Sequence, residues 1–405
     1  MSSVDWSSLP PELIQKISID LKIYADYIRF RAVCTTWRTS TPTTPTHLPC
    51  QLPWLMLPQS RSSSHRRAFF NLADNKCHVL DLPEASHRRR HSGSSHGWLV
   101  MLDEYPPIFL VNPLTRAKID LPPLSTFPYV VGFDVFNVGR EYVLQSSDDD
   151  SHVNYVSRFY TCGLKEMRDS FVKKIVLSNS PSGGSKFLAL AIINKTGDLA
   201  YWKDGLSSWG LIEGARSFCE DVIYFNGLFY AADKNGSIAV CDVGGDSPRV
   251  EFIRTPGLSD GDMQYLVIAN GELLLVTRYL ELASELGQLQ IGIGTYETRE
   301  FRVFKLDLSG SKWERVMSLG DTIMLFLGEN SSLALVASDF PECRGNRIYF
   351  TDDFSELDYS GFPGNHDLGI FNLEDGTIEQ LPCYPRTSHS HLRWPPPIWI
   401  TPNPC

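Results

Sequence analysis

The sequence predicts a mostly β protein with a small α N-terminal domain: a three-helix unit followed by a six- or seven-bladed β-propeller. Three observations support this fold class. Apolar residues recur at helical spacing near the start of the chain. From about residue 97, short apolar runs are separated by turn residues. These runs pair as a strand, a tight polar turn and a second strand, repeated at irregular spacings that are typical of propeller blades.

The composition is that of an ordinary globular protein and limits the classes of function. The chain has 405 residues, 42% hydrophobic and 21% charged, with a net charge of −10. We therefore expect neither nucleic acid nor a membrane as a partner, because the charge is acidic and the longest apolar runs are too short to span a bilayer. The N-terminus does not read as a secretory signal peptide, and the nine cysteines form no CxxC pair. These features predict reduced thiols and residence in the nucleus, the cytoplasm or both.

The first helix is predicted within residues 5–21. Two prolines in LPPEL at 9–13 suit the first helical turn, where a missing N–H costs nothing. The apolar residues of this helix share an arc of about 100° and form one stripe: Leu13, Ile14, Ile17 and Leu21.

Residues 24–33 predict a second helix whose apolar residues spread over most of the helical wheel. A segment of about 40 residues can hardly bury so much apolar surface by itself. Left bare, the surplus would form an adhesive patch. Two interpretations stay open: the helices dock on a second protein, or they form a cap packed on the β domain behind them.

The domain organisation is predicted from changes in composition. Residues 1–40 form the helical domain, and residues 41–66 are a linker rich in proline, threonine and serine. Residues 67–405 form the propeller domain. Residues 61–91 carry seven basic and three acidic residues. We interpret this positive island as solvated loops, with a nuclear import signal or an acidic partner as alternatives.

Seven segments are candidates for the hairpin units of the propeller. Five fit well: 108–124, 199–212, 238–253, 301–316 and 368–382. Two fit more poorly: 77–83 and 157–177. The rival architecture is a pair of β-sandwiches.

Asn-Gly dipeptides and the final apolar run refine the strand predictions. The dipeptides join two strands within 221–233 and within 265–278, which is the strongest short hairpin signal. A propeller avoids an open edge by pairing strands from both ends of the domain. We therefore expect residues 398–401 to share a blade with residues 68–72 or 79–82.

Catalytic and ligand-binding motifs are not recognised in the chain. The glycines of SPSGGSK at 180–186 lack the spacing of a phosphate loop, and there is no G-x-S-x-G or H-E-x-x-H. His389 and His391 alternate, but no third ligand is near them, and a metal site needs three or four. We expect no catalytic residue, no cofactor and no metal.

The first forty residues resemble an F-box. The resemblance rests on Trp6, LPPEL at 9–13, Ile17, Leu21 and DYIRFRAVCTTWR at 26–38. The remainder resembles the C-terminal domain of the plant family of F-box proteins with a kelch-like propeller of unassigned function. This second resemblance rests on SSHGWLVML at 94–102, LVNPLTRAKIDLPPL at 110–124, DVIYFNGLFYAAD at 221–233 and PPPIWITPNP at 395–404.

The resemblance implies a substrate-recognition subunit of a ubiquitin ligase. In F-box proteins the Leu-Pro start and the Val-Cys…Trp-Arg end meet in a three-helix unit that inserts against the Skp-type adaptor, and through it a cullin. The propeller would hold a target protein, whose identity the sequence does not give. Carried over to this chain, the adaptor-binding or supporting residues are Leu9, Pro10, Leu13, Ile17, Val33, Cys34 and Trp37. Cys34 is then a small buried hydrophobe and not a nucleophile.

Two alternative functions remain. The protein could be a scaffold that binds the adaptor outside a cullin complex, which cullin co-purification would decide. It could instead be a propeller-based enzyme. An enzyme would need convergent carboxylates or histidines near the central channel, and the sequence shows no such cluster.

Overall fold

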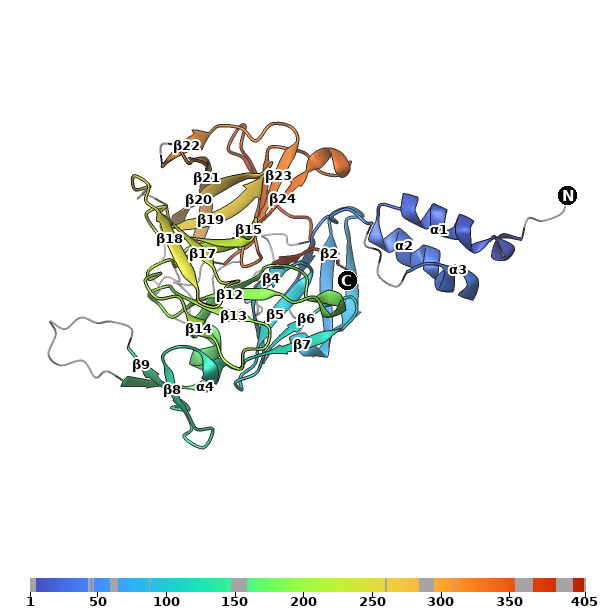
Figure 1. Cartoon of the computed structure of the whole chain (residues 1–405). Helices are drawn as coiled ribbons and strands as arrows, with labels where there is room; N and C mark the ends of the chain where they lie inside the picture. The colour runs from blue at the N-terminus through green and yellow to red at the C-terminus, as the bar shows by residue number, and fades with distance from the viewer. Residues whose placement is uncertain are drawn as a thin grey trace, which may run out of the picture.

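The chain forms a small helical unit beside a much larger β domain (Figure 1). This computed structural model describes residues 5–42, 45, 47–58, 65–86, 88–146, 159–258, 261–283, 295–309, 311–353, 367–383 and 396–403. Within those ranges no helix is both long enough and apolar enough to cross a membrane.

The helical unit contains a short 3-10 turn, η1 (Trp6–Ser8), and three α-helices: α1 (Pro11–Asp20), α2 (Tyr24–Arg31) and α3 (Thr35–Ser40). Asp5 caps η1 by accepting a hydrogen bond from the Ser7 N–H at 3.0 Å. Pro11 stands at the first position of α1, as the sequence predicts. The unit has a small core, in which Ile14 and Tyr27 are fully buried.

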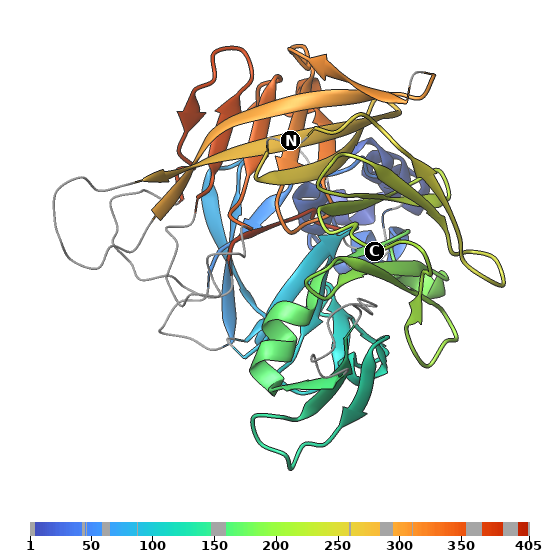
Figure 2. The same ribbon diagram turned by 90° about the vertical axis from the view of Figure 1, so that its left-hand side faces the viewer.

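The described strands form seven sheets. Six of them are arranged around a common centre (Figure 2), where β4 lies directly beside β11, and the sheet β8-β9-β10 lies outside this ring (Figure 1). The first four sheets contain β1 (Trp54–Met56), β2 (Arg66–Asn71), β3 (Lys76–Asp81) and β28 (Ile398–Ile400); β4 (Arg90–Ser95), β5 (Trp98–Leu102), β6 (Ile108–Val111) and β7 (Lys118–Leu121); β8 (Val130–Phe133), β9 (Tyr142–Gln145) and β10 (Phe159–Cys162); and β11 (Val172–Leu177), β12 (Leu188–Ile193), β13 (Asp198–Lys203) and β14 (Gly210–Leu211).

The other three sheets complete the ring. They contain β15 (Asp221–Phe225), β16 (Leu228–Ala232), β17 (Ile238–Asp242) and β18 (Arg249–Ile253); β19 (Met263–Ala269), β20 (Glu272–Ala283), β21 (Thr295–Asp307) and β22 (Lys312–Val316); and β23 (Ile323–Leu327), β24 (Leu333–Val336), β25 (Arg347–Phe350), β26 (Gly369–Asn372) and β27 (Ile378–Glu379). In the last sheet β23 pairs in parallel with β25, whereas the pairs in the other sheets are antiparallel. Apolar side chains fill the spaces between neighbouring sheets.

The five well-fitting hairpin segments each contain the last two strands of a sheet or most of them, as predicted. The Asn-Gly turns also form as predicted, because Asn226, Gly227, Asn270 and Gly271 all have positive φ. The poorly fitting segment 157–177 is not a hairpin. Its described part holds β10 and β11, which belong to different sheets and are separated by α4 (Leu164–Glu166) and the helical turn η4 (Met167–Phe171).

Both ends of the β domain meet in the sheet β28-β1-β2-β3. Leu55 of β1 lies opposite Trp399 of β28 on one side and Phe70 of β2 on the other. The predicted sharing of a sheet between the last strand and residues 68–72 is therefore confirmed. The linker prediction for 41–66 is wrong at β1, which is a strand of the β domain with Leu55 and Met56 buried.

We expect deletion of residues 396–405 to unfold the β domain cooperatively. The deletion removes β28, and with it Trp399, which is 1% exposed and packs against Phe326 and Tyr349. Loss of a buried Trp side chain alone costs about 3–5 kcal/mol. Thermal unfolding followed by circular dichroism measures the effect, with deletion of residues 1–42 as the control that should leave the β-sheet transition in place. A melting temperature unchanged by the C-terminal deletion would contradict this role for β28.

Candidate functional site

The residues predicted to bind or support an adaptor fall into two groups. Leu13, Ile17 and Val33 are 47%, 40% and 59% exposed, so they are available to a partner. Pro10 is also exposed. The other three, Leu9, Cys34 and Trp37, are half-buried. The expectation that Cys34 is buried is therefore wrong in degree, since this residue lies at the turn that leads into α3.

Trp37 has a structural role inside the helical unit. Its ring packs against Phe30 of α2 with 4.4 Å between ring centroids. Its indole Nε1–H donates to the Trp6 carbonyl at 3.1 Å. These two contacts bring the start and the end of the unit together. Trp37 thus stabilises the helical unit that carries the exposed side chains.

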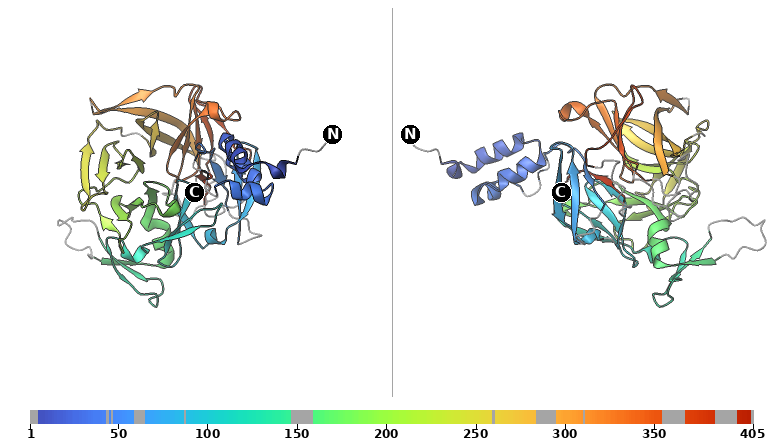
Figure 3. Two further views of the ribbon diagram at one scale, coloured as in Figure 1. Left: turned by 45° about the vertical axis from the view of Figure 1, so that its right-hand side comes forward. Right: turned by 180° about the vertical axis from the view of Figure 1, so that it is seen from behind.

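Further apolar side chains of the helical unit are exposed, and the sequence reasoning did not select them as site residues. They are Trp6 (61%), Ile19 (57%), Ile23 (57%) and Ile28 (40%). Figure 3 shows the helices standing out from the side of the β domain. The interpretation of the helices as a cap that buries its surplus apolar surface on the β domain is therefore wrong for these side chains.

The segment that leads from the helices into β1 is attached to the helical unit by polar contacts. Gln51 accepts a hydrogen bond from the Tyr24 N–H at 2.9 Å and donates one to the Lys22 carbonyl at 3.0 Å. His47 contacts the Ser18 carbonyl at 2.9 Å. These contacts hold His47 and Gln51 against the helical unit.

Buried charged side chains occupy the centre of the ring of sheets. Lys174 of β11 forms an ion pair with Asp221 of β15 at 2.5 Å, and both are nearly inaccessible. The Asp221 carboxylate also accepts hydrogen bonds from the Leu266 N–H at 2.9 Å and the Ser332 hydroxyl at 3.2 Å. One carboxylate therefore connects β11, β15, β19 and the chain between β23 and β24.

The residues between β23 and β24, 328–332, form what we call the central segment. Glu329 in this segment forms an ion pair with Arg90 at 3.2 Å, and its carboxylate lies 2.7 Å from Nδ1 of His91. The Ser331 N–H donates to the Ser94 carbonyl at 2.7 Å. Burial alone would raise the pKa of Glu329, but His91 and Arg90 lower it to about 2. The central segment is thus held in place by β4 through a charged side chain and a backbone hydrogen bond.

These contacts correct the interpretation of the basic island at 61–91 as solvated loops. Arg67, Arg90 and His91 are 1%, 6% and 0% exposed. Arg67 donates to the Ala85 carbonyl at 2.7 Å. The interpretation was wrong for these three residues because their partners are distant in the sequence or are backbone groups.

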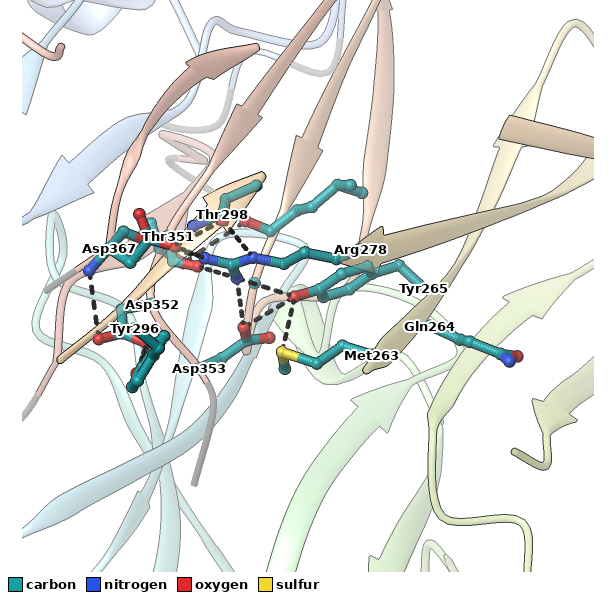
Figure 4. A network of polar contacts seen from close by, with 12 residues as sticks. Met263, Gln264, Tyr265, Arg278, Tyr296, Thr298, Thr351, Asp352, Asp353 and Asp367 are labelled. Atoms are coloured by element: carbon teal, nitrogen blue, oxygen red, sulfur yellow. Dashed lines mark hydrogen bonds and ion pairs between the residues drawn. The ribbon is translucent and has the colours of Figure 1, made fainter. Parts of the chain in front are cut away.

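Arg278 of β20 is the hub of a second buried network (Figure 4). It is 0% exposed and forms ion pairs with Asp353 at 3.2 Å and Asp367 at 2.9 Å. Its Nε–H donates to the Thr298 hydroxyl at 2.7 Å, and its guanidinium lies 4.9 Å from the centroid of the Phe350 ring. The network connects the sixth and seventh sheets.

Asp352 lies beside this network and accepts a hydrogen bond from the Tyr296 hydroxyl. Burial raises the pKa of Asp352 to about 7 and that of Asp353 to about 6, although Arg278 opposes both shifts. Tyr265 donates to Asp353 at 2.8 Å and accepts from Arg278 at 3.2 Å. Both carboxyl groups therefore have hydrogen-bond partners among neighbouring side chains, and the pKa of each is raised by burial.

The expectation that carboxylates and histidines do not converge near the centre is wrong, because these networks bring them together. Their arrangement nevertheless leaves little space for a substrate. The cavity lined by Lys174, Asp221, Tyr265, Glu329 and Asp353 has a volume of about 30 Å³. Ligand sites typically have volumes of about 300–1,000 Å³. The buried charges are used mainly to bind one another.

A metal site is not found in the part of the chain that the structure describes. There, no group of three or more His, Cys, Asp and Glu side chains could hold an ion. His389 and His391 lie outside the described residues.

We expect Asp352→Asn to change how the stability depends on pH. Folding raises the pKa of this carboxyl from 3.8 to about 7, so its ionisation destabilises the native state as the pH rises through that interval. The difference in free energy of unfolding, variant minus wild type, should therefore become more positive between pH 5 and pH 8, by about 2 kcal/mol. Urea unfolding at both pH values measures it. Asp204→Asn, on an exposed turn, is the control. If the free energy of unfolding of Asp352→Asn, relative to wild type, changes with pH no more than that of this control, the expectation is refuted.

Comparison with known proteins identifies the family of the chain. The family model of the KIB1-4 β-propeller matches residues 69–372. The F-box protein SKIP23 of Arabidopsis thaliana is 29% identical over 98% of this chain and 96% of its own length. The F-box protein At2g17036 of the same species is 28% identical over 98% of this chain and 95% of its own. The predicted propeller and the resemblance to plant F-box proteins are thus confirmed, and the chain belongs to the family of plant F-box proteins with a KIB1-4 β-propeller domain.

Proposed function

We propose that this protein is the substrate-recognition subunit of a Skp–cullin–F-box ubiquitin ligase. The helical unit binds the Skp-type adaptor, and the propeller, with the six sheets of the ring as its blades, binds a target protein. The observation that carries the proposal is the number of exposed apolar side chains on the helical unit, among them Leu13, Ile17 and Val33, in a chain whose relatives are F-box proteins. Several exposed apolar side chains on so small a unit favour a protein partner.

The β domain offers exposed apolar groups of its own, far from the helices. Phe136 and Val138, in the turn between β8 and β9, are 89% and 87% exposed. The turn itself is ordered by hydrogen bonds, including one from the Phe136 N–H to Asp134 at 3.0 Å. The hairpin and the helical unit lie at opposite sides of the molecule (Figure 1). This separation is consistent with binding a target and an adaptor at the same time.

The proposed role needs no bond chemistry from this chain. The receptor raises the effective concentration of the target near the catalytic subunits of the ligase. The buried carboxylates at the centre lack the space that a propeller-based enzyme would need. We further propose that the protein acts in the nucleus or the cytoplasm, since the described cysteines are free thiols.

We expect the double variant Leu13→Ser, Val33→Ser to bind a Skp-type adaptor at least about 10-fold more weakly than the wild type. A tenfold loss of affinity corresponds to about 1.4 kcal/mol, so each of the two truncated side chains needs to contribute only about 0.7 kcal/mol. Both side chains are exposed in this chain, so the helical fold should persist. Isothermal titration calorimetry with the purified adaptor gives the affinity, and circular dichroism gives the fold.

The matched control is Val79→Ser, Val131→Ser, which changes two similarly exposed valines of the β domain. Equal affinity of the Leu13, Val33 double variant and this control would rule out the proposed adaptor surface. Trp37→Ala should also lose affinity, but with a lower melting temperature of the helices, because Trp37 packs on Phe30. Co-purification of the wild type with the adaptor but without a cullin would favour the scaffold alternative.

A further inference from the structure

A cavity of about 540 Å³ lies between the β domain and the segment that leads to the helices. Asn330, Ser331 and Ser332 of the central segment line it, and so do residues of the inner strands of several sheets. Leu48 and Gln51 line it from the side of the helical unit. The cavity is thus bounded by parts of the chain that belong to both units.

The lining of this cavity is uncharged, although 21% of the chain is charged. Among the described residues that line it there is no Asp, Glu, Lys or Arg. Four aromatic residues contribute to it: Tyr224, Phe225, Phe326 and Trp399. Burial lowers the pKa of His96, another lining residue, which favours its neutral form. The small cavity on the other side of Glu329 is lined instead by ion pairs, so the central segment separates two chemically different environments.

The walls of the cavity are held in place by hydrogen bonds within the protein, and a ligand could bind without breaking them. The Ser331 N–H is bonded to the Ser94 carbonyl at 2.7 Å, and the Ser332 hydroxyl to Asp221 at 3.2 Å. On the opposite side, Gln51 is bonded to Tyr24 and Lys22 of the helical unit. A site whose walls are fixed in this way loses less conformational entropy when a ligand binds.

We propose that this cavity binds an uncharged small molecule with an apolar, ring-containing body and a few hydrogen-bonding groups. Its volume lies within the range of small-molecule sites, and its mixture of aromatic rings with hydroxyl and amide groups is typical of them. A charged ligand is disfavoured, because burying a charge without a partner is costly. A bound molecule would contact both units and stabilise their relative position. The proposal does not depend on the role in a ubiquitin ligase.

The test uses 1-aminoanthracene, an aromatic amine that is uncharged at pH 7 and fluoresces more strongly in apolar surroundings. Titration of the full-length protein should give saturable binding of one molecule. Ser331→Trp fills the cavity while keeping the backbone hydrogen bond to Ser94, and should weaken binding at least about 10-fold. The control Ser247→Trp, on the exposed turn between β17 and β18, should bind the probe as the wild type does.

A second comparison tests the chemistry of the site. The anionic probe 8-anilinonaphthalene-1-sulfonate should not displace 1-aminoanthracene at equal concentration, whereas a site elsewhere on the exposed apolar surface would accept both. If Ser331→Trp lowers the melting temperature, Ala334→Asp replaces it, because it adds a charge to the lining and should likewise weaken binding at least about 10-fold. Non-saturable binding, or unchanged affinity in a folded variant of either kind, overturns the proposal.

Discussion

The carboxylate of Asp221 is the group on which the centre of this propeller depends. It binds the Lys174 ammonium, the Leu266 N–H and the Ser332 hydroxyl, and so joins three neighbouring sheets to the central segment. A buried carboxylate is tolerated only when its charge is compensated. Removal of one partner of a buried ion pair typically costs about 3–5 kcal/mol, because the other charge stays behind unpaired. The positions of these inner strands are therefore coupled to one another.

The central segment is fixed by the same buried charges. Asp221 holds it at one end, and Glu329 attaches it to Arg90 and His91 of β4. The charged groups at the centre are consequently structural, and the space left beside them is about 30 Å³. On its other side the segment lines the cavity of about 540 Å³, so in the described part of the chain it separates two chemically different environments.

The sequence predicted well what local chemistry decides. Asn226 and Asn270 each precede a glycine, and this pair specifies a tight hairpin turn without help from distant residues. Strand β1 was missed because it is short, lies in a proline-rich stretch, and depends on pairing with Ile398–Ile400 at the other end of the chain. The prediction that Arg90 is solvated is wrong because its partner Glu329 is more than two hundred residues away in the sequence. Among the site residues, the motif indicated Leu13, Ile17 and Val33 but could not distinguish them from supporting residues.

The helical unit has a small buried core, while other apolar side chains on it remain exposed to solvent. Its fully buried apolar core consists of Ile14 and Tyr27, and the Trp37 contacts with Phe30 and Trp6 add to it. So small a core provides limited stability by itself. A partner that covers Leu13, Ile17 and Val33 would stabilise the folded unit through its binding free energy. The same apolar side chains whose exposure to water is unfavourable in the free unit would thus be the ones that an adaptor buries on binding.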